Sequence, residues 1–111
     1  MKKQKETNLV LTSSNPNEWK LKGELTMMSL SQEWRALENA RPGKSPWLID
    51  FTEISQMDSA GAAFLLDCIR YAEVLKLELR FFGLSKEVFE LIEAQGIVSL
   101  IEPYLKKKTA I

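Results

Sequence analysis

The part of the sequence after residue 46 alternates short apolar runs with longer amphipathic segments, and this order most constrains the fold. Residues 47–51 are largely apolar, as in a strand buried inside a sheet. Residues 59–75 carry apolar side chains at helical spacing, residues 77–84 return to a strand pattern, and residues 85–95 form a second helical segment. A strand–helix–strand–helix order is typical of parallel strands joined by crossover helices, so the sequence predicts an α/β fold.

The first half of the chain predicts a hairpin followed by a helix. Residues 9–13 and 18–24 have strand patterns, and residues 14–17, Ser-Asn-Pro-Asn, supply turn chemistry between them. A helix is expected to begin at Ser29 and to end before Arg41, where a proline and a glycine follow. This helix would lead directly into the apolar strand.

Length and composition predict one domain. The chain has 111 residues, of which 45% are hydrophobic, which suffices for one modest core. We expect the domain to span residues 8–105, with a short final helix within residues 97–105. Residues 1–7 are polar and lysine-rich and are expected to form a disordered tail, and residues 106–111 are expected to form a basic tail.

Charge and residue usage exclude several classes of function. The 15 basic and 15 acidic residues leave no net charge, so the electrostatic attraction expected of a nucleic-acid-binding protein is missing. The chain has no histidine and a single cysteine, Cys68, which excludes His-assisted catalysis, histidine zinc ligation and an internal disulfide. Asp50, Glu53 and Asp58 lack the spacing of a calcium loop, and phosphate-binding glycine loops are absent. We therefore assign no catalytic residue, metal or cofactor.

One short motif places a carboxylate next to a hydroxyl that could be modified: Asp58-Ser59-Ala60-Gly61, at the start of the long helical segment. Asp and Ser are preferred N-cap residues, so the motif taken alone is most simply helix capping. A first helical turn also favours negative charge, because its backbone N–H groups are unpaired and the helix dipole points there. The same position could therefore accept a phosphate on Ser59.

The motif belongs to a longer pattern. Gly23-Glu24-Leu25 follows the second predicted strand, the apolar strand contains Asp50, and Asp58-Ser59-Ala60-Gly61 opens the long helix. In this order and at this spacing the chain resembles the STAS domain family, in which a Gly-Glu-Leu turn and an Asp-Ser/Thr-x-Gly loop recur. The resemblance implies an α/β fold whose mixed sheet of about four to five strands is flanked by helices. It also implies a protein that binds a partner and is not an enzyme.

Two branches of this family are similar to the chain. In anti-sigma factor antagonists the position that matches Ser59 is a phosphorylated serine, but these proteins usually have serine where this chain has Ala60, and often an acidic residue where it has Thr26. The small STAS subunit of the maintenance-of-lipid-asymmetry (Mla) phospholipid ABC transporter is similar over more of the chain. It has a tryptophan in its first helix, like Trp34, and an Ala/Leu-rich helix that resembles residues 61–66. In that branch the STAS subunit binds the transporter's ATPase.

The first hypothesis is a non-enzymatic bacterial subunit that binds and stabilises or regulates the ATPase of a phospholipid-transporting ABC system. Since no apolar run approaches the roughly 20 residues of a membrane helix, we expect a cytoplasmic protein, held at the inner face of the inner membrane through a transporter complex. The alternative is an anti-sigma factor antagonist whose partner is an anti-sigma factor kinase and which phosphorylation of Ser59 switches. Asp58 and Gly61 are expected to position the loop. The residues expected to contact the partner are Ser59, Ala60, Ala63, Asp67 and Arg70.

Overall fold

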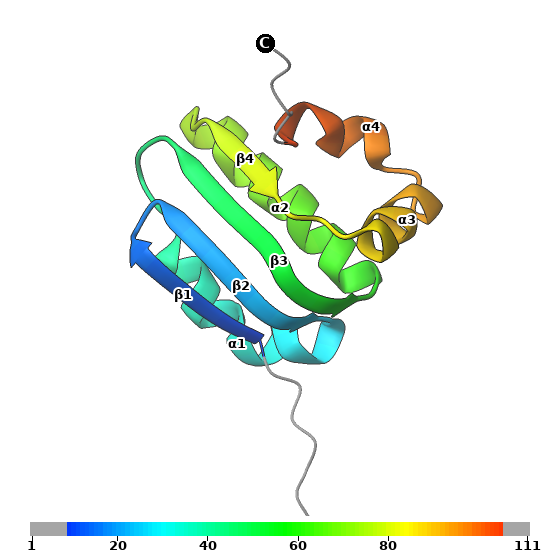
Figure 1. Cartoon of the computed structure of the whole chain (residues 1–111). Coiled ribbons are helices and arrows are strands. Elements are labelled where there is room, and N and C mark those ends of the chain that lie inside the picture. Colours follow the sequence, from blue (N-terminus) through cyan, green and yellow to red (C-terminus); the bar gives the residue numbers. More distant parts are fainter. Residues whose placement is uncertain (1–8, 106–111) are drawn as a thin grey trace, which may run out of the picture.

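The computed structural model describes residues 9–105, so the tails expected at 1–7 and 106–111 lie outside the described residues. A single sheet is flanked by helices, as Figure 1 shows. Its strands are β1 (Leu9–Asn15), β2 (Glu18–Leu25), β3 (Trp47–Met57) and β4 (Leu79–Phe82). The helices are α1 (Met27–Ala40), α2 (Ser59–Leu75), α3 (Lys86–Ala94) and α4 (Val98–Ile101), followed by a 3-10 turn, η1 (Glu102–Tyr104).

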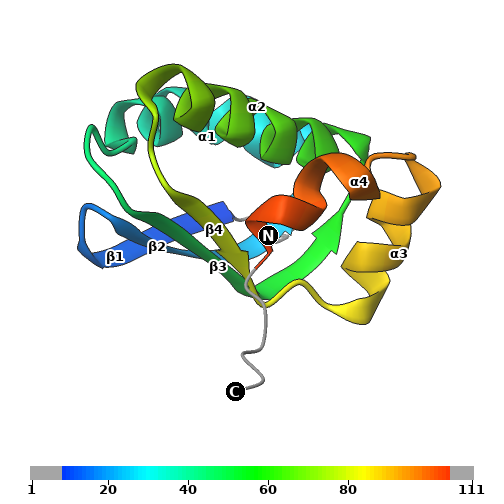
Figure 2. The same cartoon turned by 90° about the horizontal axis from the view of Figure 1, so that it is seen from above.

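The sheet is mixed, and its strands lie in the order β1-β2-β3-β4. The β1–β2 hairpin is antiparallel, whereas β2–β3 and β3–β4 are parallel. Each parallel pair is joined by a crossover helix, α1 or α2, and both helices cover the same face of the sheet (Figure 2). The predicted α/β class, hairpin and parallel crossovers are confirmed, and the number of strands in the described residues is four.

Several element boundaries differ from the sequence prediction; β4, for example, spans Leu79–Phe82 and not residues 77–84. Two of the differences lie where α1 and α2 begin. Helix α1 begins at Met27 and not at Ser29, because Thr26 is its N-cap and exchanges hydrogen bonds with Ser29 in a capping box. Ser29 is fully buried, and its hydroxyl also donates to the Glu24 carbonyl at 2.6 Å. Strand β3 continues beyond residue 51 to Met57, which brings the end of the strand to the start of α2.

The core lies between the sheet and the two crossover helices. Alternate residues of β3 point into it, so Trp47, Ile49 and Phe51 are almost completely buried. The Trp47 ring makes edge-to-face contacts with Trp19 of β2 at 5.0 Å and with Tyr71 of α2 at 5.5 Å between centroids. These contacts tie the strand layer to the helix layer and fix the height of α2 above the sheet.

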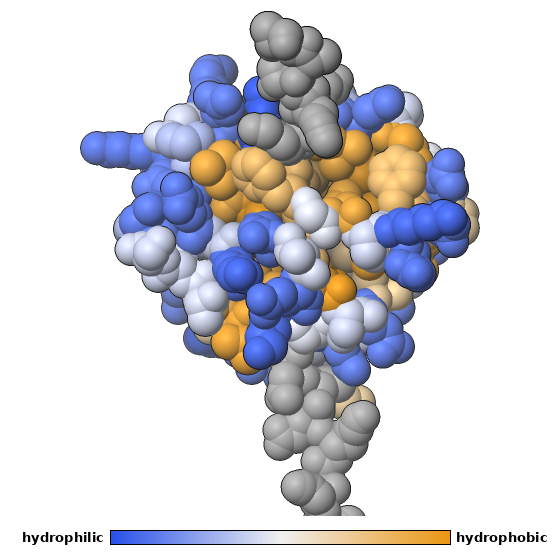
Figure 3. Space-filling view, viewed as in Figure 1, coloured by the Kyte–Doolittle hydropathy of each residue, from blue (hydrophilic) through white to orange (hydrophobic). Residues whose placement is uncertain are grey.

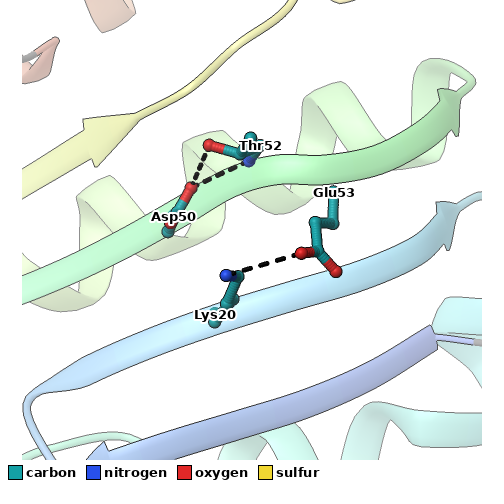
Figure 4. Close-up of polar contacts among 4 residues, drawn as sticks. All are labelled: Lys20, Asp50, Thr52 and Glu53. Carbon is teal, nitrogen blue, oxygen red and sulfur yellow. Dashed lines mark hydrogen bonds and ion pairs between the residues drawn. The ribbon is translucent and has the colours of Figure 1, made fainter.

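The opposite face of the sheet carries no helix in the described residues (Figures 1 and 2). Polar side chains alternate with the buried ones along the central strands, and Figure 4 shows two of their pairings. The Lys20 ammonium lies 3.5 Å from the Glu53 carboxylate, and the Asp50 carboxylate accepts from the backbone N–H and hydroxyl of Thr52 at 2.8 and 2.5 Å. Apolar residues also surface at this side, over β4 and toward α3, where Figure 3 shows them as orange patches among polar neighbours.

Candidate functional site

The N-termini of α1 and α2 meet at one end of the sheet, and one carboxylate joins them. Asp58 is the N-cap of α2, and its Oδ1 accepts from the backbone N–H groups of Ala60 at 2.8 Å and of Gly61 at 3.3 Å. Its Oδ2 accepts from the N–H of Met27, the first residue of α1, at 3.1 Å. A single negative charge therefore lies at two helix N-termini, where both dipoles favour it.

Gly61 lets α2 start against the end of β2. A methyl group at this position would lie 2.6 Å from the Leu25 carbonyl oxygen and would also collide with the Met57 side chain. Any side chain at this position would therefore force its neighbours to shift. The role predicted for Asp58 and Gly61, positioning the loop, stays a prediction, and these are the contacts through which they would perform it.

Ser59 follows Asp58 and is exposed, and next to it a groove runs between α1 and α2. Of the predicted contact residues, Ala63 and Arg70 are exposed, whereas Ala60 and Asp67 are half-buried. The small side chains of Ala60 and Ala63 lower the α2 side and leave a groove of about 570 Å³. Its lining residues are Met27, Leu30, Ser31, Trp34, Ala60, Ala63, Phe64 and Asp67.

The groove is apolar at its floor and adaptable at its rim. Leu30 and Phe64 are buried, and Phe64 meets the Trp34 ring edge-to-face at 6.3 Å. Met27 is 68% exposed and its neighbour Met28 60%, an unusual exposure for large apolar residues. Unbranched, polarizable methionine side chains suit a surface that adapts to another molecule. These methionines were not among the predicted contact residues, although a Met pair just after the Gly-Glu-Leu turn is a visible signal in the sequence.

Asp67 is held by a neighbour within the chain. Its carboxylate pairs with Arg41, the C-cap residue of α1, and lies 3.9 Å from Arg70. The Arg41 guanidinium lies over the rings of Tyr71, at 4.7 Å, and Trp34, at 5.4 Å. Arg41 was not predicted as a site residue, because the sequence around an arginine at the end of a helix does not show which other helix its side chain contacts.

The one cysteine of the chain lies in the core. Cys68 is fully buried, and burial raises the pKa of its thiol far above the ordinary value, so it packs as a small apolar side chain. Residues 9–105 contain no group of three or more His, Cys, Asp or Glu side chains that could hold a metal ion. No helix in this same part of the chain is long and apolar enough to cross a bilayer.

The fold and site thus define a small α/β domain with an apolar groove beside the N-termini of its paired crossover helices. The chain belongs to the STAS domain family: the family model described as "Mlab, STAS domain" matches residues 10–102. It is also similar to the anti-sigma-B factor antagonists of Listeria monocytogenes and Listeria innocua, each 39% identical over 54 residues. That match covers 49% of this chain and 47% of each relative, so the chain spans about half the length of these relatives.

Proposed function

We propose that this protein is a non-enzymatic STAS subunit that binds and stabilises or regulates the ATPase of a phospholipid-transporting ABC system. The α1–α2 groove, with exposed Ser59 at its end, would receive the ATPase. The observation that carries the proposal is the combination of an apolar groove, a highly exposed methionine at its rim and small alanines on its α2 side. Binding a partner over such a surface is favourable, since each Å² of apolar area removed from water contributes about 25 cal/mol to the free energy of binding.

The family match supports this choice of partner. The Mlab-type STAS model covers residues 10–102, nearly all of the described part of the chain, whereas the antagonist match covers 49% of the sequence. Members of the STAS family typically act through protein–protein contacts and without catalysis of their own. The absence of histidine from the whole chain and the burial of Cys68 agree with a binding role.

The second candidate is an anti-sigma factor antagonist switched by phosphorylation of Ser59. The antagonist relatives favour it, and so does the exposed position of Ser59 next to the groove. A phosphate there would add about 1.5 to 2 negative charges beside Asp58, whose carboxylate already occupies the N–H groups of the first turn. Like-charge repulsion at the groove's end would then oppose binding of the partner.

Ser59 variants test the site and separate the two candidates. The partner is first captured from native cells with the tagged full chain and identified, and its affinity for each variant is then titrated. Ser59→Glu should abolish binding with the fold intact, because it adds charge and bulk beside Ala60 and Ala63. Ser59→Ala should weaken an ATPase complex by about 1 to 3 kcal/mol if the hydroxyl hydrogen-bonds the partner, whereas an antagonist should bind normally and lose its regulation.

A matched control is Ser13→Glu, which places the same change on exposed β1, far along the chain from the groove. It should leave the affinity unchanged, and circular dichroism should show the same folded signal for all three variants. Wild-type affinity in folded Ser59→Glu would remove Ser59 from the interface and overturn the proposed site. An ABC ATPase as the captured partner supports the first candidate, and a histidine-kinase-like anti-sigma factor supports the second.

The non-enzymatic role has its own test. Purified protein should hydrolyse ATP and phosphate esters no faster than a blank, because the chain has neither histidine nor a phosphate-binding glycine loop. Turnover that follows the protein through purification and disappears in Asp58→Ala would contradict this assignment.

A further inference from the structure

We propose that two polar clamps, one at each end, hold the α1–α2 groove at a fixed width, and that Asp58 and Arg41 act as positioning residues for the partner site. This inference rests on the proposed function of the groove. The first clamp is the Asp58 carboxylate between the two helix N-termini. The second is the Arg41–Asp67 ion pair, which joins the end of α1 to the middle of α2.

The first clamp uses both oxygens of one side chain. Oδ1 accepts only from α2 and Oδ2 accepts from Met27 of α1, so the carboxylate spans the space between the helices. The backbone N–H of Asp58 also donates to the Leu25 carbonyl at 3.2 Å, which fixes the loop to the end of β2. Any widening of the groove at this end must therefore break the Asp58–Met27 bond.

The second clamp is partly shielded from water. The Arg41 side chain is 13% exposed and that of Asp67 29%, so this ion pair is screened less than an open surface pair. The guanidinium also covers the Trp34 and Tyr71 rings, and the Tyr71 hydroxyl donates to the Pro42 carbonyl at 2.9 Å. One arginine thus connects α1, the loop after it and α2.

Between the clamps one aromatic contact joins the helices, Phe64 of α2 against Trp34 of α1. The nine steps from Asp58 to Asp67 rise about 14 Å along α2, and over this length α2 presents the small Ala60 and Ala63 to the groove beside Phe64. Without the clamps, the two helices could move apart or slide past each other, and the groove would not keep one width. A groove held at one width in advance lowers the ordering cost of binding, which is how preorganisation raises affinity.

This arrangement gives different roles to Asp67 and Arg70, two residues of α2 that were both predicted to contact the partner. Asp67 is already paired with Arg41 and acts through it, so it positions the groove and does not contact the partner. Arg70, whose side chain is 77% exposed, is not needed for the clamp although it lies 3.9 Å from the same carboxylate.

Trp34 reports the state of the groove in the free protein, without any partner. The chain has three tryptophans, and 5-fluorotryptophan labelling should give one fluorine NMR signal for each, with Trp34→Phe identifying the Trp34 signal. Arg41→Met keeps the apolar stem but removes the charge, and it should shift or broaden the Trp34 signal while those of Trp19 and Trp47 stay in place. Arg70→Met is the matched control and should leave all three signals unchanged.

A double-mutant cycle with the partner identified above tests the consequence for binding. Arg41→Met and Asp67→Asn should each lower the affinity about tenfold, and the double variant should also lose about tenfold instead of a hundredfold, because both remove one clamp. Asp58→Asn should lower the affinity as well, since one of its two acceptor oxygens becomes a donor. Ser85→Ala removes the cap of α3 instead and should bind normally. Arg41→Lys should recover part of the lost affinity, since it restores the charge.

An unchanged Trp34 signal in folded Arg41→Met, or additive losses in the cycle, would overturn the clamp. A loss in Asp67→Asn with none in Arg41→Met would do the same, because it would make Asp67 a direct contact. Filling the groove with Ala63→Phe separates the two proposals. If Ala63→Phe blocks binding while the clamp variants do not weaken it, the clamp is wrong and the proposed function stands. If Ala63→Phe binds normally, the proposed site is wrong, and the Trp34 signal still decides whether the clamp exists.

Discussion

Two of the concave surfaces of the domain differ in chemistry more than in size. One is the α1–α2 groove of about 570 Å³, and the other is a hollow of about 730 Å³ on the open face of the sheet. Residues of β1, β2, β3 and β4 line the hollow, including Thr12, Lys20 and Asp50. The larger cavity therefore lies on the sheet, and the smaller one lies between two helices.

Two sets of polar groups in and beside the hollow are already paired with each other. Lys20 faces Glu53, and Asp50 binds the hydroxyl and N–H of Thr52, as Figure 4 shows. The groove instead leaves Met27 highly exposed over an apolar floor. Covering the hollow would remove water from polar groups that are already paired within the protein, which is unfavourable. Covering the groove instead removes apolar area from water, which is favourable. The comparison shows why the smaller cavity is the better candidate for a partner.

The largest effect is expected from a charge placed on the helix-covered face of β3. Ile49 is fully buried, so Ile49→Asp would place an unpaired carboxylate in the core at a cost of several kcal/mol, comparable with the stability of a small domain. We expect this variant to lose its cooperative thermal transition. Leu48→Asp is the matched control one residue earlier, on the open face, and should still melt cooperatively. A wild-type melting temperature for Ile49→Asp would show that the two faces do not differ as described.

A smaller effect is expected where α2 starts. Gly61→Ala should lower the free energy of unfolding by about 1 to 3 kcal/mol, because the added methyl group meets the Leu25 carbonyl and the Met57 side chain. Gly43→Ala, where nothing lies within 4 Å of the added group, should change stability little. Urea titrations of both variants measure the difference. Equal stability for the two would contradict the close approach that defines this end of the groove.

Ala63→Phe fills the groove directly. Ala63 is exposed, so the ring can be accommodated without disturbing the core, and the melting temperature should stay near that of the wild type. Binding of the partner should weaken at least tenfold, about 1.4 kcal/mol. Ala94→Phe on exposed α3 and Thr12→Phe in the hollow are the controls and should bind normally. If Thr12→Phe alone lost binding, the result would show that the partner binds the open face of the sheet and not the groove.

The sequence predicts most of the fold because its patterns are local. The bounds of α2 agree at both ends: Asp58 is a strong cap signal, and the structure ends the helix at Leu75 with Lys76 as a left-handed C-cap residue. The start of α1 was misplaced by two residues because Ser29 is an equally good cap by type, and only its burial reveals that it lies inside the first turn.

The candidate site could be predicted only in part. Asp58, Ser59 and Gly61 belong to a contiguous motif, so the sequence located them together. The Asp58 bond to Met27 joins residues 31 positions apart, and the Arg41–Asp67 pair joins residues 26 apart. Contacts at such separations depend on how two helices are placed on the sheet, which no local pattern encodes.

The smallest effect is expected from the ion pair beside the hollow. Lys20 and Glu53 lie on neighbouring strands with their charged atoms 3.5 Å apart, and both side chains are nearly half exposed. Such pairs contribute about 0 to 1 kcal/mol, because water screens them and two long side chains must be held in place. Lys20→Met should therefore shift the urea midpoint only slightly, with most of the small difference lost at high salt, and should leave partner binding unchanged. A loss of binding as large as that of Ala63→Phe would mean that the charges of the hollow contact the partner. The contrast between a hollow whose charges are paired within the chain and a groove that exposes apolar surface would then no longer hold.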